Sequence, residues 1–109
     1  PYSEWEEAML KISVIDNARQ RRLVVEGKLI APWAAVLRSA CEKASAELGD
    51  RELIIELKYV TAIGTEGENV ILELINEGIK FRGDGVFTKH VMKELTRRAR
   101  ENLRVREGN

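Results

Sequence analysis

The 109-residue sequence predicts one small α/β domain spanning the whole chain, in which a mixed β-sheet carries its helices mainly on one face. Alternating apolar residues near the N-terminus indicate an antiparallel hairpin, and the continuous apolar run at 53–57 is typical of a central strand covered on both faces. Three further stretches place apolar residues at helical spacing. Right-handed crossovers between the parallel strands then put both connecting helices on the same face.

The chain opens with an N-terminal extension over residues 1–8, in which the segment 3–9 is expected to form a short helix capped by Ser3. Trp5 and Met9 lie four residues apart on that helix and would share one side of it. They are therefore the nearest candidates to cover the second face of the central strand.

A hairpin follows this extension. Residues 10–14 alternate between apolar and polar, as in a strand with one buried face. Residues 16–18 supply Asp and Asn for a turn, and residues 23–25 form the second strand, which ends near Gly27.

Helix and strand alternate in the middle of the chain. Pro32 opens the first helix, since its missing N–H costs nothing in a first turn, and Gly49 is a natural stop. Cys41 lies on the apolar face of this helix and is expected to be a packed core thiol. The central strand at 53–57 comes next, and an irregular connection at 59–63 follows it.

The second helix begins at Thr65, because Thr65 and Glu68 match a capping box, and it stops at Gly78. Residues 79–82 alternate in polarity and predict a short edge strand with its charges facing outward.

The C-terminal third of the chain is basic. A last helix is expected over 86–102, with apolar residues at four-residue spacing, and residues 104–109 are expected to form a flexible tail. Residues 1–16 are acidic, whereas nine Lys and Arg stand against four Asp and Glu from Ile79 onward. One interpretation is that the arginines of the last helix, joined by three near residue 20, bind RNA or an acidic protein surface. These residues are Arg97, Arg98, Arg100, Arg104, Arg106, Arg19, Arg21 and Arg22.

Composition narrows the function classes. Eighteen Lys and Arg balance eighteen Asp and Glu, which argues against a general nucleic-acid binder, and no aromatic residue interleaves with the terminal arginines. One cysteine and one histidine exclude a disulfide framework and a two-histidine metal motif. Because no membrane span or signal peptide is visible, a cytoplasmic protein is expected. The chain begins with proline, as a segment of a longer protein would.

No catalytic motif stands out. The sequence has no nucleophile elbow, no Walker loop and no Rossmann fingerprint. Its carboxylates lie on expected outer helix faces, and His90 is expected at the surface. The sequence therefore predicts a protein that is not an enzyme and that needs no cofactor or metal.

The segment 59–69 is the most informative, since it follows a buried strand and ends on a helix N-terminus with unpaired N–H groups. In its order of motifs the chain resembles the STAS domain, shared by bacterial anti-sigma factor antagonists and sulfate-transporter tails. The resemblance covers roughly residues 9–103. Its anchors, in chain order, are Val24–Leu29, Leu53–Leu57, Val60–Ile63, Gly67 and Glu77–Phe81.

The resemblance implies a regulatory site at the strand-to-helix turn. The family turn usually reads Asp-Ser-Ser-Gly, and its second serine is phosphorylated by a kinase that is itself an anti-sigma factor. Aligned on Gly67, this chain reads Gly64-Thr65-Glu66-Gly67, so that Glu66 stands at the phosphoacceptor position and Gly64 at the aspartate position. Ile30 stands where the family has a second acid. Ordinary control by phosphorylation is therefore not expected at this turn.

Two interpretations of Glu66 stay open. In the first interpretation, it is a carboxylate in the first turn whose attraction to the positive end of the helix dipole stabilises the helix by about 0.3–1 kcal/mol. Alternatively, it permanently imitates part of a phosphoserine, with about one charge in place of nearly two. Thr65 keeps a hydroxyl beside it and is interpreted as a helix cap rather than a phosphosite.

The functional hypothesis is a regulatory module for signal transduction and transcription that docks a protein partner. The contact would be formed by Thr65, Glu66, Glu68 and Asn69 together with Ile30 and Trp33. A core position for Trp33 is an equally supported alternative. The resemblance implies an anti-sigma factor kinase or a larger signalling complex as partner. A STAS domain of an anion transporter or of a larger signalling scaffold is the alternative. A basic helix that binds nucleic acid is a further alternative, and a homodimer is left open.

Overall fold

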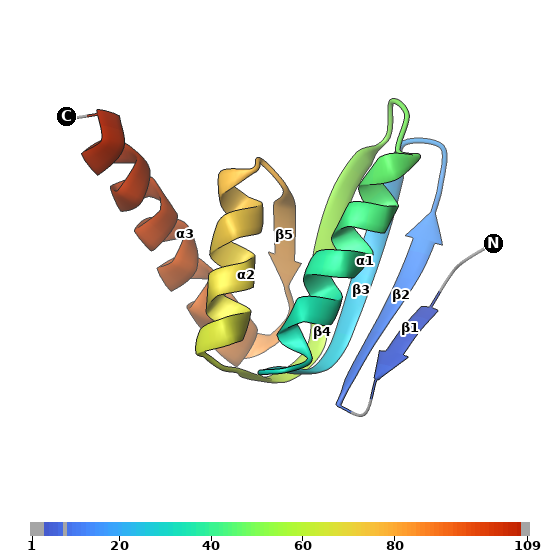
Figure 1. Ribbon diagram of the computed structural model, residues 1–109, viewed down its shortest axis with the longest axis horizontal. Helices are drawn as coiled ribbons and strands as arrows, with labels where there is room; N and C mark the ends of the chain where they lie inside the picture. The colour runs from blue at the N-terminus through green and yellow to red at the C-terminus, as the bar shows by residue number, and fades with distance from the viewer. Residues whose placement is uncertain (1–3, 8, 108–109) are drawn as a thin grey trace.

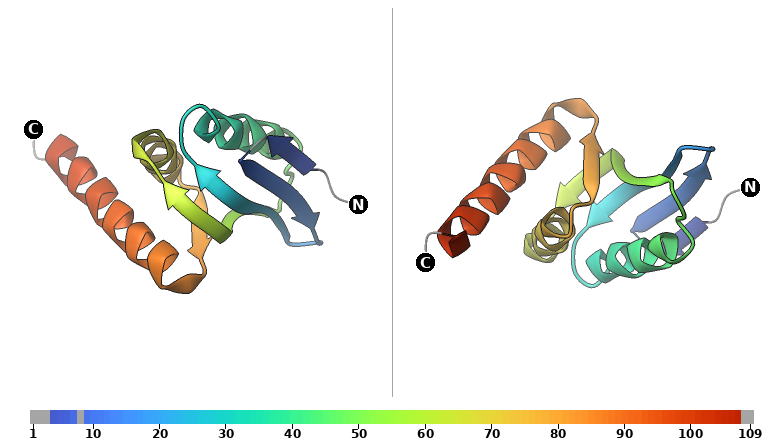
Figure 2. Two further views of the ribbon diagram at one scale, coloured as in Figure 1. Left: turned by 90° about the horizontal axis from the view of Figure 1, so that it is seen from below. Right: turned by 90° about the horizontal axis from the view of Figure 1, so that it is seen from above.

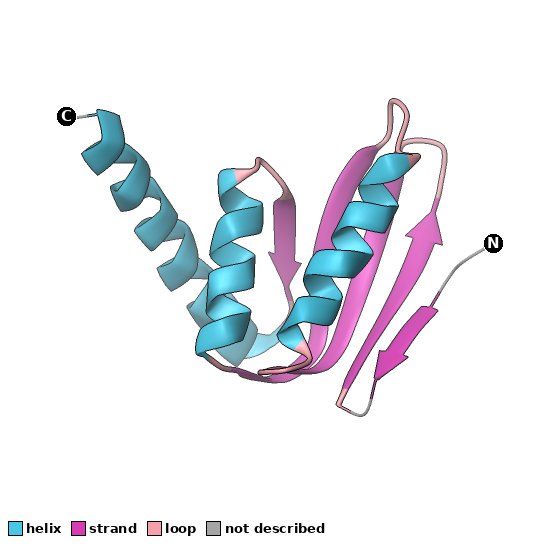
Figure 3. Ribbon diagram, in the orientation of Figure 1, coloured by secondary structure: helices cyan, strands magenta, loops and turns pink. Residues whose placement is uncertain are grey.

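In a computed structural model that describes residues 4–7 and 9–107, five strands form one sheet flanked by three helices (Figures 1 and 3). The elements in chain order are β1 (Glu4–Glu7), β2 (Leu10–Asp16), β3 (Gln20–Leu29), α1 (Ala34–Ala46), β4 (Glu52–Ile63), α2 (Thr65–Asn76), β5 (Lys80–Gly83) and α3 (Gly85–Glu107). This is the predicted α/β fold with a mixed sheet.

Strand order in the sheet follows the order of the chain, β1-β2-β3-β4-β5. The first three strands pair antiparallel, and β4 pairs parallel with both β3 and β5. Leu57 in β4 lies opposite Val25 on one side and Gly83 on the other. The prediction that 53–57 is a buried strand between parallel neighbours is confirmed.

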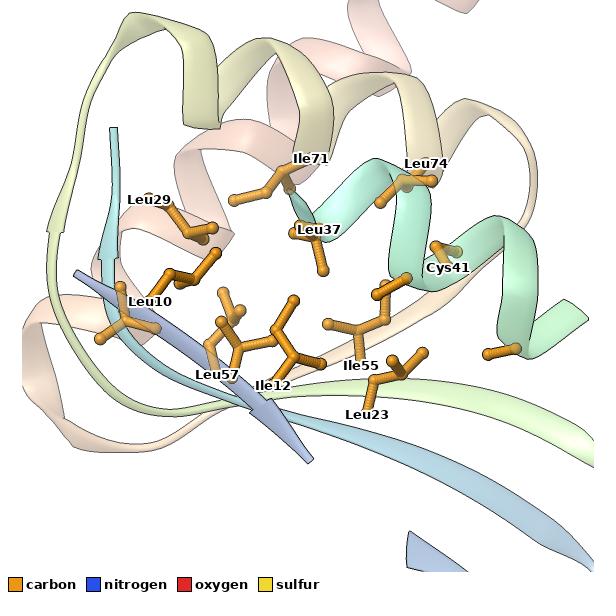
Figure 4. Close-up of a cluster of buried hydrophobic side chains, with 14 of the residues drawn as sticks. Leu10, Ile12, Leu23, Leu29, Leu37, Cys41, Ile55, Leu57, Ile71 and Leu74 are labelled. Carbon is orange, nitrogen blue, oxygen red and sulfur yellow. The ribbon is translucent and has the colours of Figure 1, made fainter. Parts of the chain in front are cut away.

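The main core lies between the sheet and the helices α1 and α2, which cover the same face (Figure 2). Cys41 is buried in this cluster, which confirms a packed core position, and burial raises the pKa of its thiol. Side chains from both layers meet in this cluster, as Figure 4 shows for Leu10, Ile12, Leu23, Leu29, Leu37, Cys41, Ile55, Leu57, Ile71 and Leu74.

The second face of the sheet carries no helix within the described residues, so the short helix predicted to cover it is wrong (Figure 2). Residues 4–7 form β1 beside β2 instead of a helix, because four residues gain more from strand pairing than from an isolated helical turn. Met9 is exposed, and the expected cap Ser3 lies outside the described residues. On this face Val24 and Ile54 are buried, and an ion pair between Arg22 and Glu56 lies beside them.

Two strands are longer than expected. β3 continues through Gly27 to Leu29, and β4 runs on to Ile63, where an irregular connection was expected. Gly27 lies at a register shift with a φ of 108°, and an added Cβ would be 2.2 Å from the Met9 carbonyl oxygen. Gly27 therefore marks a bulge within β3 rather than its end.

Two helix boundaries also differ from the prediction. α1 begins at Ala34, after a turn that contains a cis Ala31–Pro32 peptide bond, so Pro32 precedes the helix rather than opening it. α3 is helical to Glu107, which overturns the flexible tail for residues 104–107, while 108–109 lie outside the described residues. The apolar face predicted for α3 is buried only in the middle of the helix, at Leu95 and Ala99. It is exposed near the two ends of the helix, at Phe87 and Leu103.

The β2–β3 turn forms as predicted and carries an ion-pair cluster. The Asn17 side chain accepts hydrogen bonds from the N–H groups of Arg19 and Gln20, both at 2.8 Å. Asp16 pairs with Arg21 at 2.8 Å and with Arg51 at 3.3 Å, and the Arg21 hydrogen bond is the main cause that lowers the pKa of Asp16.

The Asp16 cluster predicts a specific pH dependence. A lowered pKa in the folded protein means that the carboxylate stabilises the fold above the unfolded-state pKa of about 4 and loses this contribution as the pH falls. Asp16→Asn should therefore lower the free energy of unfolding at pH 7 by about 1 kcal/mol or less, and the gap from wild type should close in acid. Urea unfolding at pH 7 and pH 3 measures both values; a gap that widens in acid would contradict the assignment.

Candidate functional site

The candidate site lies where the parallel strands β3 and β4 end side by side (Figure 1). Leu29 is the last residue of β3, and its carbonyl oxygen accepts a hydrogen bond from the Gly64 N–H at 3.0 Å. The loop 30–33 leads from there into α1, and Gly64 leads into α2. The two segments that the resemblance places together are therefore neighbours at one edge of the fold.

Gly67 holds the first turn of α2 close against the end of β3. An added Cβ at Gly67 would lie 2.2 Å from the Leu29 carbonyl oxygen and 2.9 Å from the Leu29 Cβ. Only a residue without a side chain fits this approach, because Cβ atoms do not come so near to backbone oxygens. Gly67 is buried, and it fixes where the exposed residues around it stand.

The start of α2 presents Thr65, Glu66 and Asn69 to solvent. Gly64 is the N-cap residue in extended conformation, and no side chain makes a cap hydrogen bond there. The predicted capping box between Thr65 and Glu68 is therefore wrong, since the helix begins one position too early for a Thr65 cap. The two acidic residues of the first turn, Glu66 and Glu68, still interact favourably with the positive end of the helix dipole.

Glu68 turns toward α3 rather than toward the helix start. Its carboxylate lies 3.5 Å from the Arg98 guanidinium, and both side chains are partly exposed. Of the predicted contact residues, Glu68 thus links α2 to α3, while Glu66 and Asn69 remain at the exposed turn.

A shallow groove of about 330 Å³ runs between the first turns of α1 and α2. Of the described residues that line it, Glu66 alone is charged; the others are Ala31, Pro32, Ala34, Ala35 and Val70. The sequence analysis missed these small residues, although the Ala-Pro and Ala-Ala pairs around Trp33 were a signal for a surface on which a partner backbone can come close.

The two apolar residues predicted to contact a partner, Ile30 and Trp33, are each only partly exposed to solvent. Ile30 is half-buried, and its Cγ2 would be 3.3 Å from a Cβ at Gly64. Trp33 is also half-buried and packs against the main core from its position just before α1. Trp33 therefore supports the fold with one side and leaves the other open to solvent.

Within the described part of the chain, no group of three metal-ligating side chains is close enough to hold a metal ion. His90 is exposed on α3, as predicted, and Cys41 lies in the core. The groups that the site presents are one carboxylate, helix-end N–H groups and a small apolar groove.

No family model matches the chain, and no curated protein matches its sequence. No helix among the described residues is long and apolar enough to cross a bilayer.

Proposed function

We propose that this domain is a non-catalytic, STAS-like module that binds a protein partner through the turn between β4 and α2. The observation that supports it most is the placement of Thr65, Glu66 and Asn69, which are exposed beside an apolar groove. The contact between Gly67 and Leu29 holds this surface in one geometry, so that little ordering is needed when a partner docks.

Glu66 gives this surface a permanent negative charge at the position of the family's phosphoserine. A carboxylate supplies part of the charge and oxygen count of a phosphate group. The module is thereby held near the weakly binding state, and an anti-sigma kinase finds no hydroxyl to modify at position 66.

The partner that fits this role is an anti-sigma factor kinase of the family type, or a signalling complex that contains one, in the cytoplasm. A nucleic-acid partner has less support, because several arginines already have carboxylate partners. Arg97 pairs with Glu94 and Glu101, and Arg21 pairs with Asp16.

The proposal predicts a position-specific loss of binding. Asn69→Arg places a bulky cation on the exposed start of α2 and should weaken binding of a family-type anti-sigma factor by about tenfold or more, or 1.4 kcal/mol. Asn76→Arg is the matched control, the same change at the exposed other end of the same helix, and should leave the affinity unchanged. Titration calorimetry measures both, and equal effects of the two variants would place the contact elsewhere.

A further inference from the structure

The free edge of β5 offers unpaired backbone groups. β5 is the last strand of the sheet and pairs with β4 alone. The Asp84 N–H donates to the Leu57 carbonyl oxygen at 3.2 Å, which shows which backbone groups face β4. Because successive residues of a strand turn their N–H and C=O groups to opposite sides, Phe81 and Gly83 direct theirs to the free edge.

The helix α3 diverges from β5 along its length (Figures 1 and 2). Residues of both elements line a groove of about 500 Å³. Half-buried Phe81 and Met92 supply its apolar part. Exposed Lys89, Lys93 and Arg100 line the α3 side and recur along one helix face.

Three of the four cations that line this groove have no carboxylate partner among the described residues. In the described part of the chain, no acidic side chain lines the groove and no carboxylate pairs with Lys89, Lys93 or Arg100. The fourth cation of the groove, Arg97, differs because Glu94 and Glu101 each approach it to 2.6 Å. Three adjacent free cations on one wall favour a negatively charged occupant.

We propose that this groove binds an extended acidic segment of a partner protein, which adds a strand to β5 and sets its carboxylates against the cations of α3. Strand addition would use the backbone groups of Phe81 and Gly83, and alternate side chains would reach the apolar part of the groove. Because α3 forms the far wall, the groove favours a single extended segment over the edge of a second sheet. The inference stands apart from the proposed function, because it uses a different surface.

A defined peptide tests this inference. The probe is an eight-residue peptide of alternating Glu and Val, blocked at both ends and labelled for fluorescence anisotropy. It should bind the full chain, and its affinity should fall as salt is raised from about 50 to 500 mM. Lys93→Gln with Arg100→Gln should weaken binding by about fivefold, as expected for two exposed ion pairs. Arg19→Gln with Lys43→Gln, which changes the net charge equally but away from the groove, should leave the affinity unchanged.

Backbone methylation separates strand addition from simple charge attraction. One peptide carries N-methyl groups on its Val residues and a second carries them on its Glu residues. Because only one of these alternating sets can face β5, one peptide should bind like the parent and the other should lose binding. Equal binding of both methylated peptides, equal weakening by the two double variants, or no binding of the parent peptide would each overturn the inference.

Discussion

Replacing Gly67 by alanine is expected to lower the free energy of unfolding by about 3 kcal/mol, at the upper end of the usual cost of overpacking. The added Cβ would be 2.2 Å from the Leu29 carbonyl oxygen, and that atom belongs to backbone that already accepts a hydrogen bond from Gly64. Neither strand end nor helix start can relax without the other, so the first turn of α2 must move. Urea unfolding at constant pH measures the loss.

Gly64→Ala is the matched control for this effect. It changes the same turn by the same methyl group, but the nearest neighbour of the added Cβ is the Cγ2 methyl of Ile30 at 3.3 Å, a side-chain contact that a small shift relieves. Its cost should stay below about 1 kcal/mol, mostly from a less favourable N-cap residue. Similar losses for both variants would contradict the view that the Gly67 contact holds the candidate site in place.

Local patterns were sufficient where one face of an element is buried against the core. The alternation at 10–14 and the apolar run at 53–57 predicted β2 and the centre of β4, because the burial of each strand face determines which of its positions are apolar. They failed at 59–63, which is a strand because β3 lies beside it, and β3 is far from this segment along the chain. They also failed at 4–7, where the short segment pairs with the neighbouring β2 instead of forming a helical turn.

The candidate site was predictable in its position and not in its detail. The carboxyl ends of parallel strands meet at one edge, so 30–33 and 64–69 had to be neighbours once the topology was right. The capping box failed because Gly64, and not Thr65, takes the N-cap conformation. The link from Glu68 to Arg98 and the groove beside Glu66 depend on how helices pack, and spacing within one segment carries no information about that.

The role of Glu66 has the most direct consequence for function. If its carboxylate holds the module in a weakly binding state, Glu66→Ser removes an anion from the contact surface. A like-charge clash inside an interface costs several kcal/mol, whereas an exposed one costs far less. The affinity for a family-type anti-sigma factor should therefore rise more than tenfold, or about 1.4 kcal/mol, when position 66 lies inside the contact.

Glu68→Gln is the control for this substitution, since it removes a carboxylate on the same helix that faces Arg98 instead of the turn. It should leave the affinity unchanged and lower stability only slightly, as expected for a partly exposed ion pair. Titration calorimetry of wild type, Glu66→Ser and Glu68→Gln against the anti-sigma factor is the decisive measurement. We predict that Glu66→Ser alone binds more than tenfold tighter; unchanged or weaker binding by Glu66→Ser would contradict the account and leave Glu66 as a helix-end charge.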